Sequence, residues 1–369
     1  MRIVGLTAHR YDLPLHHPIG LSTGLLTTRT GLILTLATST GLVGRGDVAP
    51  LPGFSAESLP EAEAGVRALA EKIVGRTAPV DPDASGMWSD RVARWVWRLE
   101  LPASVMTGLQ AAIVDLLAVH RGETPAQTLH PDASSEVRVN GLLLGDADHV
   151  LADATRLRAS GFRAVKLKVG RGDVAEETRL VRSVRAVLGP DVALRLDANR
   201  AWKEDEALTF ARGVEGCDIA YIEEPLRDPS RLVSFSRRSG LPVALDETVS
   251  ERAVEDLERW RGVRAVVLKP TLLGGCEFTL WMARRAINAG MTAVVSACFE
   301  SGVGTAGLAC LAAALDQPDV PVGLDTYRWI AEDVVEASLD MSHGRLRIAD
   351  AVEAMRAPLS AHVRLIPLP

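Results

Sequence analysis

The stretch Ala164-Val165-Lys166-Leu167-Lys168-Val169-Gly170 decides our interpretation of the fold. Its apolar residues and lysines alternate, which is typical of a β-strand and places Lys166 and Lys168 on the same face. The other residues of the strand are apolar, so we expect a buried strand, and lysine is rarely buried without a partner. We therefore expect other parts of the chain to supply negative charge opposite these two ammonium groups.

Strand-like runs recur through the second half of the sequence, each followed by a longer amphipathic segment. The starts of successive runs are 22 to 29 residues apart, which is the length of a βα unit. Eight units of nearly equal length favour a modified, TIM-like (β/α) barrel of the α/β class over the alternative, an open doubly wound sheet. The expected strands are residues 137–144, 164–169, 193–197, 219–223, 243–246, 265–269, 292–296 and 321–325.

The N-terminal part of the chain has a different pattern, in which strands come first and helices follow. We expect strands at residues 1–13, 31–38 and 42–48, a Gly/Ser/Thr-rich loop at 18–24, and helices at 58–74 and 103–120. The βα period stops after residue 325. We therefore predict an α+β capping domain over residues 1–100, completed by residues 326–369, and a barrel domain over residues 101–325.

Composition excludes several classes of partner. The net charge of -6 provides no basic surface for nucleic acid or an anionic membrane. The four cysteines are scattered without a CxxC pair, which argues against a disulfide framework or zinc cluster and fits a reducing compartment. No run approaches the roughly 18 apolar residues of a membrane span. We expect a soluble, cytoplasmic protein that acts on a small molecule, and the sequence does not indicate an oligomeric state.

Charged residues stand at the C-terminal ends of five consecutive expected strands, where barrel enzymes carry their active sites. No histidine lies between residues 150 and 342, so chemistry there depends on carboxylates and lysines. Three carboxylates without His or Cys favour Mg²⁺, or Mn²⁺, over zinc. The residues concerned are Lys166, Lys168, Asp197, Glu223, Asp246 and Lys269.

Each of these residues also has an ordinary structural explanation. A lone Lys-x-Lys can lie on a solvated edge strand, and a lone acidic residue at a strand end is often a helix N-cap. We assign Glu224 and Glu247 to caps, to contacts behind the site or to solvent. Six suitable residues on five consecutive strand ends are hard to explain in this way, so we predict a metal site flanked by lysines.

This constellation resembles the enolase superfamily, and within it the muconate-lactonizing subgroup, whose signature is Lys-x-Lys on the second strand and a single Lys on the sixth. The o-succinylbenzoate synthase family is most similar. The segments that carry this similarity are Arg195-Leu196-Asp197-Ala198-Asn199-Arg200-Ala201-Trp202, Gly262-Val263-Arg264-Ala265-Val266-Val267-Leu268-Lys269-Pro270-Thr271-Leu272, Gly323-Leu324-Asp325-Thr326 and Pro50-Leu51-Pro52-Gly53-Phe54-Ser55.

The resemblance implies a hydro-lyase of menaquinone biosynthesis that converts the dicarboxylate 2-succinyl-6-hydroxy-2,4-cyclohexadiene-1-carboxylate to o-succinylbenzoate by syn dehydration. Removing a proton next to a carboxylate requires strong stabilisation of charge, which a metal on the three carboxylates supplies. Lys168 is expected to act as base and then as acid, with a pKa lowered by the metal and by Lys166. Lys269, on the opposite side of the barrel mouth, is expected to stabilise the developing charge.

The rest of the substrate is expected to meet the inward-facing Arg195, the loops at 18–27 and 50–55, and the loop after the seventh strand. In that last loop, Ser296-Ala297-Cys298-Phe299-Glu300-Ser301 departs from the more serine-rich family pattern. The predicted substrate-binding residues are Arg195, Ser296, Cys298, Gly302, Gly323, Phe54 and Ser22.

Other reactions use the same lysines. N-succinylamino acid racemase, dipeptide epimerase and muconate cycloisomerase all remain as alternatives, because the six residues do not discriminate among them. A barrel that only binds ligands or serves as a scaffold would be expected to have lost one of the six.

Overall fold

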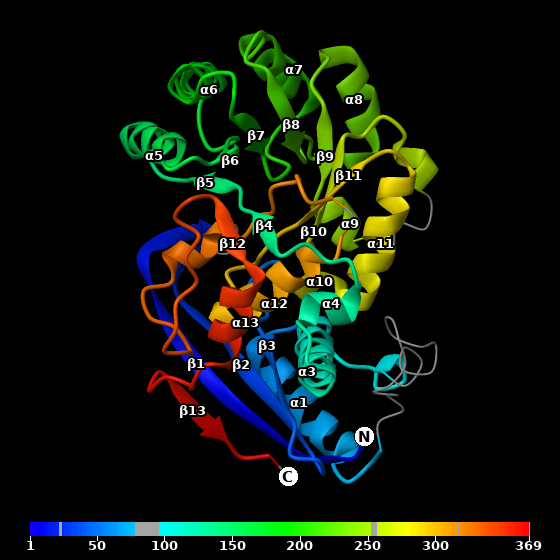
Figure 1. Cartoon of the computed structure of the whole chain (residues 1–369). Helices are drawn as coiled ribbons and strands as arrows, with labels where there is room; N and C mark the ends of the chain where they lie inside the picture. Colours follow the sequence, from blue (N-terminus) through cyan, green and yellow to red (C-terminus); the bar gives the residue numbers. More distant parts are fainter. Residues whose placement is uncertain (22–23, 78–95, 252–256, 316, 369) are drawn as a thin grey trace.

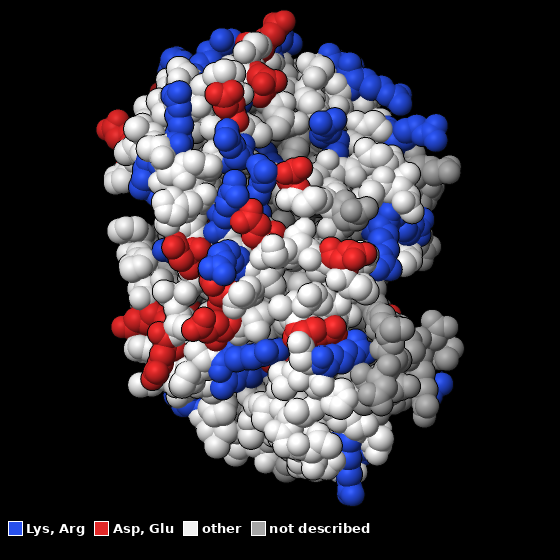
Figure 2. All heavy atoms as spheres, viewed as in Figure 1, with Lys and Arg blue, Asp and Glu red and all other residues white. Residues whose placement is uncertain are grey.

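The computed structural model describes residues 1–369 except 22–23, 78–95, 252–256, 316 and 369. Figure 1 shows an antiparallel sheet at one end of the molecule, close to both termini, and a curled parallel sheet with helices around it at the other end. Figure 2 shows basic and acidic side chains interspersed over one face, which agrees with a small net charge of -6.

The N-terminal sheet is antiparallel, with the strand order β13-β1-β2-β3. Pairing of β1 with β2 continues to Leu21 and Gly24, so residues 18–21 and 24 of the expected loop belong to these strands, while residues 22–23 lie outside the described residues. The C-terminal strand β13 pairs with β1, which brings the end of the chain back onto this sheet. The strands are β1 (Ile3–Leu21), β2 (Gly24–Thr38), β3 (Val43–Val48) and β13 (Val363–Ile366).

Helices α1 (Leu59–Ile73) and α3 (Ala103–Arg121) cover this sheet, and both were expected. A capping box begins α1, because Ser58 Oγ accepts from the Glu61 amide while the Glu61 carboxylate accepts from the Ser58 amide. Helix α3 lies so close to β3 that a Cβ on Gly46 would come within 1.9 Å of the Gly108 carbonyl oxygen. Helix α3, which the predicted division assigns to the barrel domain, thus packs directly on the N-terminal sheet.

Helix α3 is also long and apolar enough, by length and composition alone, to cross a membrane, contrary to the expectation from the sequence. Its apolar window has a mean hydropathy of 1.4, and 67% of that window is buried inside the fold. The core helix of a globular domain passes the same test, and we interpret α3 as such a helix.

Seven parallel strands form the second sheet, and the order β11-β10-β9-β8-β7-β6-β5 follows the chain without a reversal. A doubly wound sheet reverses its strand order, so that alternative is excluded and the barrel-like prediction is confirmed. Figure 1 shows the helices that follow the strands on the outside of the curl. The strands are β5 (Gly141–Leu143), β6 (Ala164–Lys168), β7 (Ala193–Asp197), β8 (Ile219–Glu223), β9 (Val243–Leu245), β10 (Ala265–Leu268) and β11 (Thr292–Val295). The helices of this half are α4 (Pro125–Leu129), α5 (Ala147–Ala159), α6 (Val174–Leu188), α7 (Glu204–Gly213), α8 (Leu232–Ser239), α9 (Glu247–Glu251), α10 (Pro270–Leu273), α11 (Cys276–Asn288) and α12 (Gly302–Ala313).

The first and last expected barrel strands differ from the prediction. Residues 137–144 divide into β5 and a separate strand β4 (Glu136–Arg138), which pairs with β12 (Arg345–Arg347) instead. Residues 321–325 form only two bridges, Val322 with Val139 and Gly323 with Ser296. Pro321 has no amide to donate, and the chain turns at once into the 3₁₀ helix η3 (Asp325–Trp329). These two bridges join the edges of the seven-stranded sheet, and helix α13 (Ile348–Arg356) follows β12.

Asp47, at the end of β3, connects the N-terminal sheet to the barrel. Its buried carboxylate accepts hydrogen bonds from Tyr11 Oη at 2.9 Å and from the Ser301 amide and hydroxyl at 3.0 and 2.7 Å. Burial raises the pKa of Asp47 to about 6, against the opposing effect of these hydrogen bonds.

This shift predicts how stability depends on pH. Between pH 4 and pH 6 the folded protein keeps a proton that the unfolded chain has released, so Asp47 makes the protein less stable as pH rises. Asp47→Asn removes this slope, and its stability relative to wild type should improve by about 3 kcal/mol between pH 4 and pH 7. Urea unfolding across this range measures the effect. Asp340→Asn is the matched control, because hydrogen bonds from Ser342 lower the pKa of Asp340 and the relative change should have the opposite sign. Parallel pH profiles for Asp47→Asn and wild type would contradict the prediction.

Candidate active site

The six charged residues predicted from the strand ends lie together at the C-terminal edge of the parallel sheet. Pairing aligns Lys168 of β6 with Asp197 of β7, and Asp197 with Glu223 of β8. Asp246 and Lys269 directly follow β9 and β10. Because the strands are parallel and in order, their ends bring together residues that are far apart in the chain.

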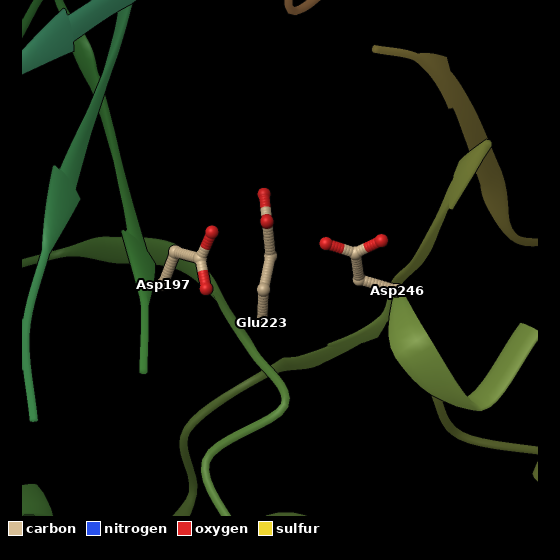
Figure 3. Close-up of side chains that lie close together, drawn as sticks. All are labelled: Asp197, Glu223 and Asp246. Atoms are coloured by element: carbon tan, nitrogen blue, oxygen red, sulfur yellow. The ribbon is translucent and has the colours of Figure 1, made fainter. Parts of the chain in front are cut away.

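Asp197, Glu223 and Asp246 form the centre of this site. Their side chains are only 1 to 2% exposed, and each has an oxygen within 4.8 Å of an oxygen of the others. Figure 3 shows the three carboxylates directed toward a common region, with Glu223 between the two aspartates. Three buried carboxylates repel one another, so the arrangement requires compensating positive charge.

The three lysines supply part of that charge. Lys166 Nζ lies 3.2 Å from Asp197 Oδ2 and 2.9 Å from Glu223 Oε2, and Lys168 Nζ lies 2.6 Å from Asp197 Oδ2. Lys269 Nζ lies 2.5 Å from Asp246 Oδ2. The lysines therefore flank the triad, with Lys166 and Lys168 beside Asp197 and Lys269 beside Asp246.

Burial and the neighbouring charges shift the pKa values of Glu223, Asp197 and Lys269. Burial raises the pKa of Glu223 to about 8, and the neighbouring Asp197 and Asp246 add to this effect while Lys166 opposes it. Burial also opposes ionisation of Asp197, but Lys168 and Lys166 outweigh it and hold the pKa of Asp197 well below its usual range. Against burial, Asp246 raises the pKa of Lys269. Glu223 thus ionises less readily than an ordinary glutamate, and Asp197 more readily than an ordinary aspartate.

The residues fit a hard divalent cation. Asp246 Oδ1 is buried and has no hydrogen-bond partner among the residues that the structure describes. An ionised oxygen left unpaired in the interior is costly, and a cation beside it would satisfy it. Three carboxylate oxygens without sulfur or imidazole match Mg²⁺ or Mn²⁺. The triad is therefore positioned for a metal ion.

Glu224 accepts a hydrogen bond from the backbone amide of Asp246 and so helps to position that residue of the triad. It is fully buried, and its carboxylate accepts from the Asp246 amide at 3.0 Å, from the Thr248 amide at 2.9 Å and from Arg200 Nε at 3.1 Å. The expectation of a contact behind the site is confirmed for this residue. Its backbone has a φ of 40°, a left-handed conformation that is costly for a residue with a side chain.

Asn199 is a residue of the site that the sequence pattern does not single out, and it contacts Glu247, which we assign from the sequence to caps, to contacts behind the site or to solvent. Asn199 Oδ1 accepts from Lys168 Nζ at 2.7 Å, and Asn199 Nδ2 donates to Glu247 Oε1 at 2.9 Å. Burial, followed by the charges of Asp246 and Asp197, raises the pKa of Glu247 to about 7. The position of Asn199 two residues after Asp197 was the only signal in the sequence, and a polar residue after a strand is too common to be decisive.

A cavity of about 610 Å³ opens above the triad and is lined from both halves of the molecule. Residues of the N-terminal half reach it from the β1–β2 hairpin and from the loop after β3. Phe54 of that loop places its ring centroid 5.5 Å from Lys269 Nζ. The N-terminal sheet and its loops therefore cap the open end of the barrel.

The predicted substrate-binding residues separate into two groups. Phe54, Ser296, Cys298 and Gly323 line the cavity, and burial raises the pKa of the Cys298 thiol, which favours its neutral form. The others do not line the cavity, or cannot be placed.

Arg195 is buried below the cavity, where it donates to the Pro321 carbonyl at 2.7 Å and stacks over Tyr221. It therefore holds the segment that closes the barrel, and the expected contact with a substrate carboxylate is not supported. The Gly302 amide already donates to Asp333 at 2.9 Å, so it is not available to a ligand in this structure. Ser22 lies outside the described residues.

Two sequence-family models match the chain. One, described as enolase C-terminal domain-like, matches residues 149–352, and the other, described as the MenC N-terminal domain, matches residues 2–86. The o-succinylbenzoate synthase of Vibrio cholerae serotype O1 (strain M66-2) is 36% identical over 327 residues, which cover 87% of this chain and 88% of that protein. Protein PHYLLO, chloroplastic, of Arabidopsis thaliana is 33% identical over 84% of this chain, which spans only 20% of its length.

Solved structures with the same fold include a muconate lactonizing enzyme from Pseudomonas fluorescens complexed with muconolactone. Its TM-score is 0.85 at 23% identity, with 97% of each chain covered. A dipeptide epimerase from Cytophaga hutchinsonii, complexed with Mg and the dipeptide D-Ala-L-Val, has a TM-score of 0.80 at 22% identity, with 94% of each chain covered. At these identities the structures establish the fold alone.

Proposed function

The chain belongs to the enolase superfamily, and on that premise we propose that it is an o-succinylbenzoate synthase, a hydro-lyase of menaquinone biosynthesis. The proposed reaction is the syn dehydration of 2-succinyl-6-hydroxy-2,4-cyclohexadiene-1-carboxylate. The observation that carries the proposal is the pair Lys168 and Lys269 on the two sides of a buried carboxylate triad. Similarity to o-succinylbenzoate synthases over nearly the whole chain supports this reaction over others that use the same residues.

A divalent cation, Mg²⁺ or alternatively Mn²⁺, would be held by Asp197, Glu223 and Asp246, and when bound it supplies Lewis-acid stabilisation of negative charge on the substrate carboxylate. Lys168 Nζ takes the proton from the ring carbon that bears this carboxylate. The carbon–oxygen bond at the neighbouring carbon then breaks, the ring gains its third double bond, and Lys168 returns the proton to the departing hydroxyl as water. One lysine performs both transfers because both bonds break on the same face of the ring.

The remaining groups orient the substrate and balance its charge. Lys166, between Asp197 and Glu223, is a second cation on the same strand face as Lys168. Lys269 stabilises the ring from the other side as charge develops. The triad, one divalent cation and three protonated lysines sum to +2, or to +1 when Lys168 is the neutral base, and a substrate with one or two carboxylates balances this charge. The loop that carries Phe54 excludes water from the cavity.

N-succinylamino acid racemase, dipeptide epimerase and muconate cycloisomerase are the alternative reactions, because solved structures of this fold include a dipeptide epimerase and a muconate lactonizing enzyme. A cytoplasmic location forms part of the proposal, since none of the four cysteines forms a disulfide.

Two parallel assays test the synthase reaction against the racemase reaction. The purified protein is given the cyclohexadiene substrate with and without Mg²⁺, and aromatisation is followed by ultraviolet absorbance. In parallel, it is given an N-succinylamino acid, and racemisation is followed by optical rotation. We expect Mg²⁺-dependent aromatisation. Racemisation without aromatisation would contradict the proposed function.

A further inference from the structure

Arg29 of β2 is a fully buried arginine that donates hydrogen bonds to main-chain carbonyl oxygens. Its Nη1 donates to the carbonyls of Thr30 and Pro50 at 2.8 Å each, its Nη2 donates to the Ala49 carbonyl, and its Nε donates to the Phe299 carbonyl at 3.0 Å. Among the described residues it forms no ion pair with a carboxylate. A planar guanidinium spreads five donors over three nitrogens and can reach carbonyls on separate segments, whereas the three donors of a lysine all lie on one nitrogen.

Three of these carbonyls belong to segments that reach the cavity above the triad, and one of the three residues, Phe299, lines it directly. Ala49 and Pro50 begin the loop that places Leu51 and Phe54 on the cavity. Phe299 lines the same cavity from the barrel side. The guanidinium therefore connects the capping loop to the barrel loop at a sequence separation of 270 residues.

The barrel loop around Phe299 has a strained backbone, and hydrogen bonds hold it in that conformation. Phe299 has a φ of 60°, a left-handed conformation that costs an aromatic residue about 1–2 kcal/mol. Arg29 holds its carbonyl, and the Glu300 carboxylate accepts from the Cys298 amide at 2.5 Å and from Thr271 Oγ1 at 2.6 Å. The loop is thus fixed in a strained shape by two buried charged side chains.

We propose that Arg29 is a positioning residue for substrate binding, which fixes the Phe54 wall of the cavity relative to the Phe299 wall and so determines affinity for the part of the substrate that does not react. Lys168, which transfers the proton, stands on β6, and Lys269, which stabilises charge, directly follows β10, so their positions depend on the sheet rather than on Arg29. Loss of Arg29 should therefore affect substrate binding more than the chemical step. The inference rests on the proposed function.

The chain offers a matched control in Arg45 of β3. This half-buried arginine also joins distant segments through carbonyls, since its Nη1 donates to Met355 and Ala357 near the C-terminal end of α13. None of these residues lines the cavity above the triad. Arg45→Met leaves orphaned carbonyls as Arg29→Met does, but away from the substrate.

The experiment compares Arg29→Met, Arg29→Lys and Arg45→Met with the wild type. The readouts are thermal unfolding, Mg²⁺ affinity by calorimetry, and KM and kcat for aromatisation. We expect both methionine variants to lose stability and to keep Mg²⁺ affinity within about threefold. Arg29→Met should raise KM at least tenfold with kcat changed less than about threefold, whereas Arg45→Met should leave KM unchanged. Arg29→Lys keeps the charge but not the planar fork, and its KM should lie between those of Arg29→Met and the wild type.

The outcomes separate the inference from the proposed function. If the wild type aromatises the substrate and Arg29→Met matches Arg45→Met in KM, the inference fails and the proposed function stands. A wild-type KM in Arg29→Lys would show that charge alone matters and would also overturn it. If neither Arg29 variant folds, the role of Arg29 lies in folding and the inference is wrong. A wild type that does not aromatise the substrate would overturn both.

Discussion

Lys168→Ala is expected to abolish aromatisation, a loss of about four orders of magnitude in kcat, while Mg²⁺ still binds. In the proposed mechanism the neutral amine of Lys168 takes the proton and the resulting ammonium returns it, and an alanine side chain can do neither. Lys168 is not one of the proposed metal ligands, which are the three carboxylates of the triad. Its removal deletes a positive charge 2.6 Å from Asp197, so affinity for a cation should stay the same or increase.

Ultraviolet assays of turnover and calorimetric titration with Mg²⁺ measure the two effects separately. Lys168→Arg is an informative companion, because arginine keeps the positive charge but stays protonated at any usable pH and should be equally inactive. Lys203→Ala, on an exposed lysine, is the control for general effects of losing a lysine. Substantial activity in Lys168→Ala would remove this residue as the base.

Asp246→Asn is expected to weaken Mg²⁺ binding by about a hundredfold or more, and turnover should require correspondingly more Mg²⁺. The substitution keeps the shape of the side chain but removes one of the three charges that would hold the ion. It also changes the buried Oδ1 that has no partner in the described part of the chain, and leaves Lys269 beside a neutral amide.

Calorimetry with Mg²⁺, and activity as a function of Mg²⁺ concentration, test this prediction. Asp228→Asn is the matched control, because Asp228 also follows β8 at the C-terminal edge of the sheet but caps the short helix η1 (Pro229–Arg231). An unchanged Mg²⁺ affinity in Asp246→Asn would sink the assignment of Asp246 as a ligand.

The sequence predicted the parts of the fold that depend on local periodicity. Alternation around Lys166 and Lys168 predicted a strand with both lysines on one face, and the βα period predicted a curled parallel sheet. The resemblance to the enolase superfamily is confirmed. The period failed at residues 321–325, because spacing alone does not show that a segment starting at Pro321 makes only two bridges before it turns into η3.

Residue types at strand ends were also enough to assemble the six charged residues, because parallel strands in order bring their ends together whatever lies between them. The same reasoning does not specify the contacts of Arg195. Its position on β7 was right for the interior, but its partners are Pro321 and Tyr221, and nothing in the spacing of β7 specifies them.

The sequence by itself thus determined the sheet, its order and the identity of the charged residues, since each follows from short-range pattern repeated along the chain. Only the tertiary structure decided how these residues are held. Glu224 reaches the Asp246 amide across 22 residues, and Arg29 reaches the Phe299 carbonyl across 270. The physical reason is that a buried polar group must find a partner wherever the fold places one, and sequence distance does not limit that choice.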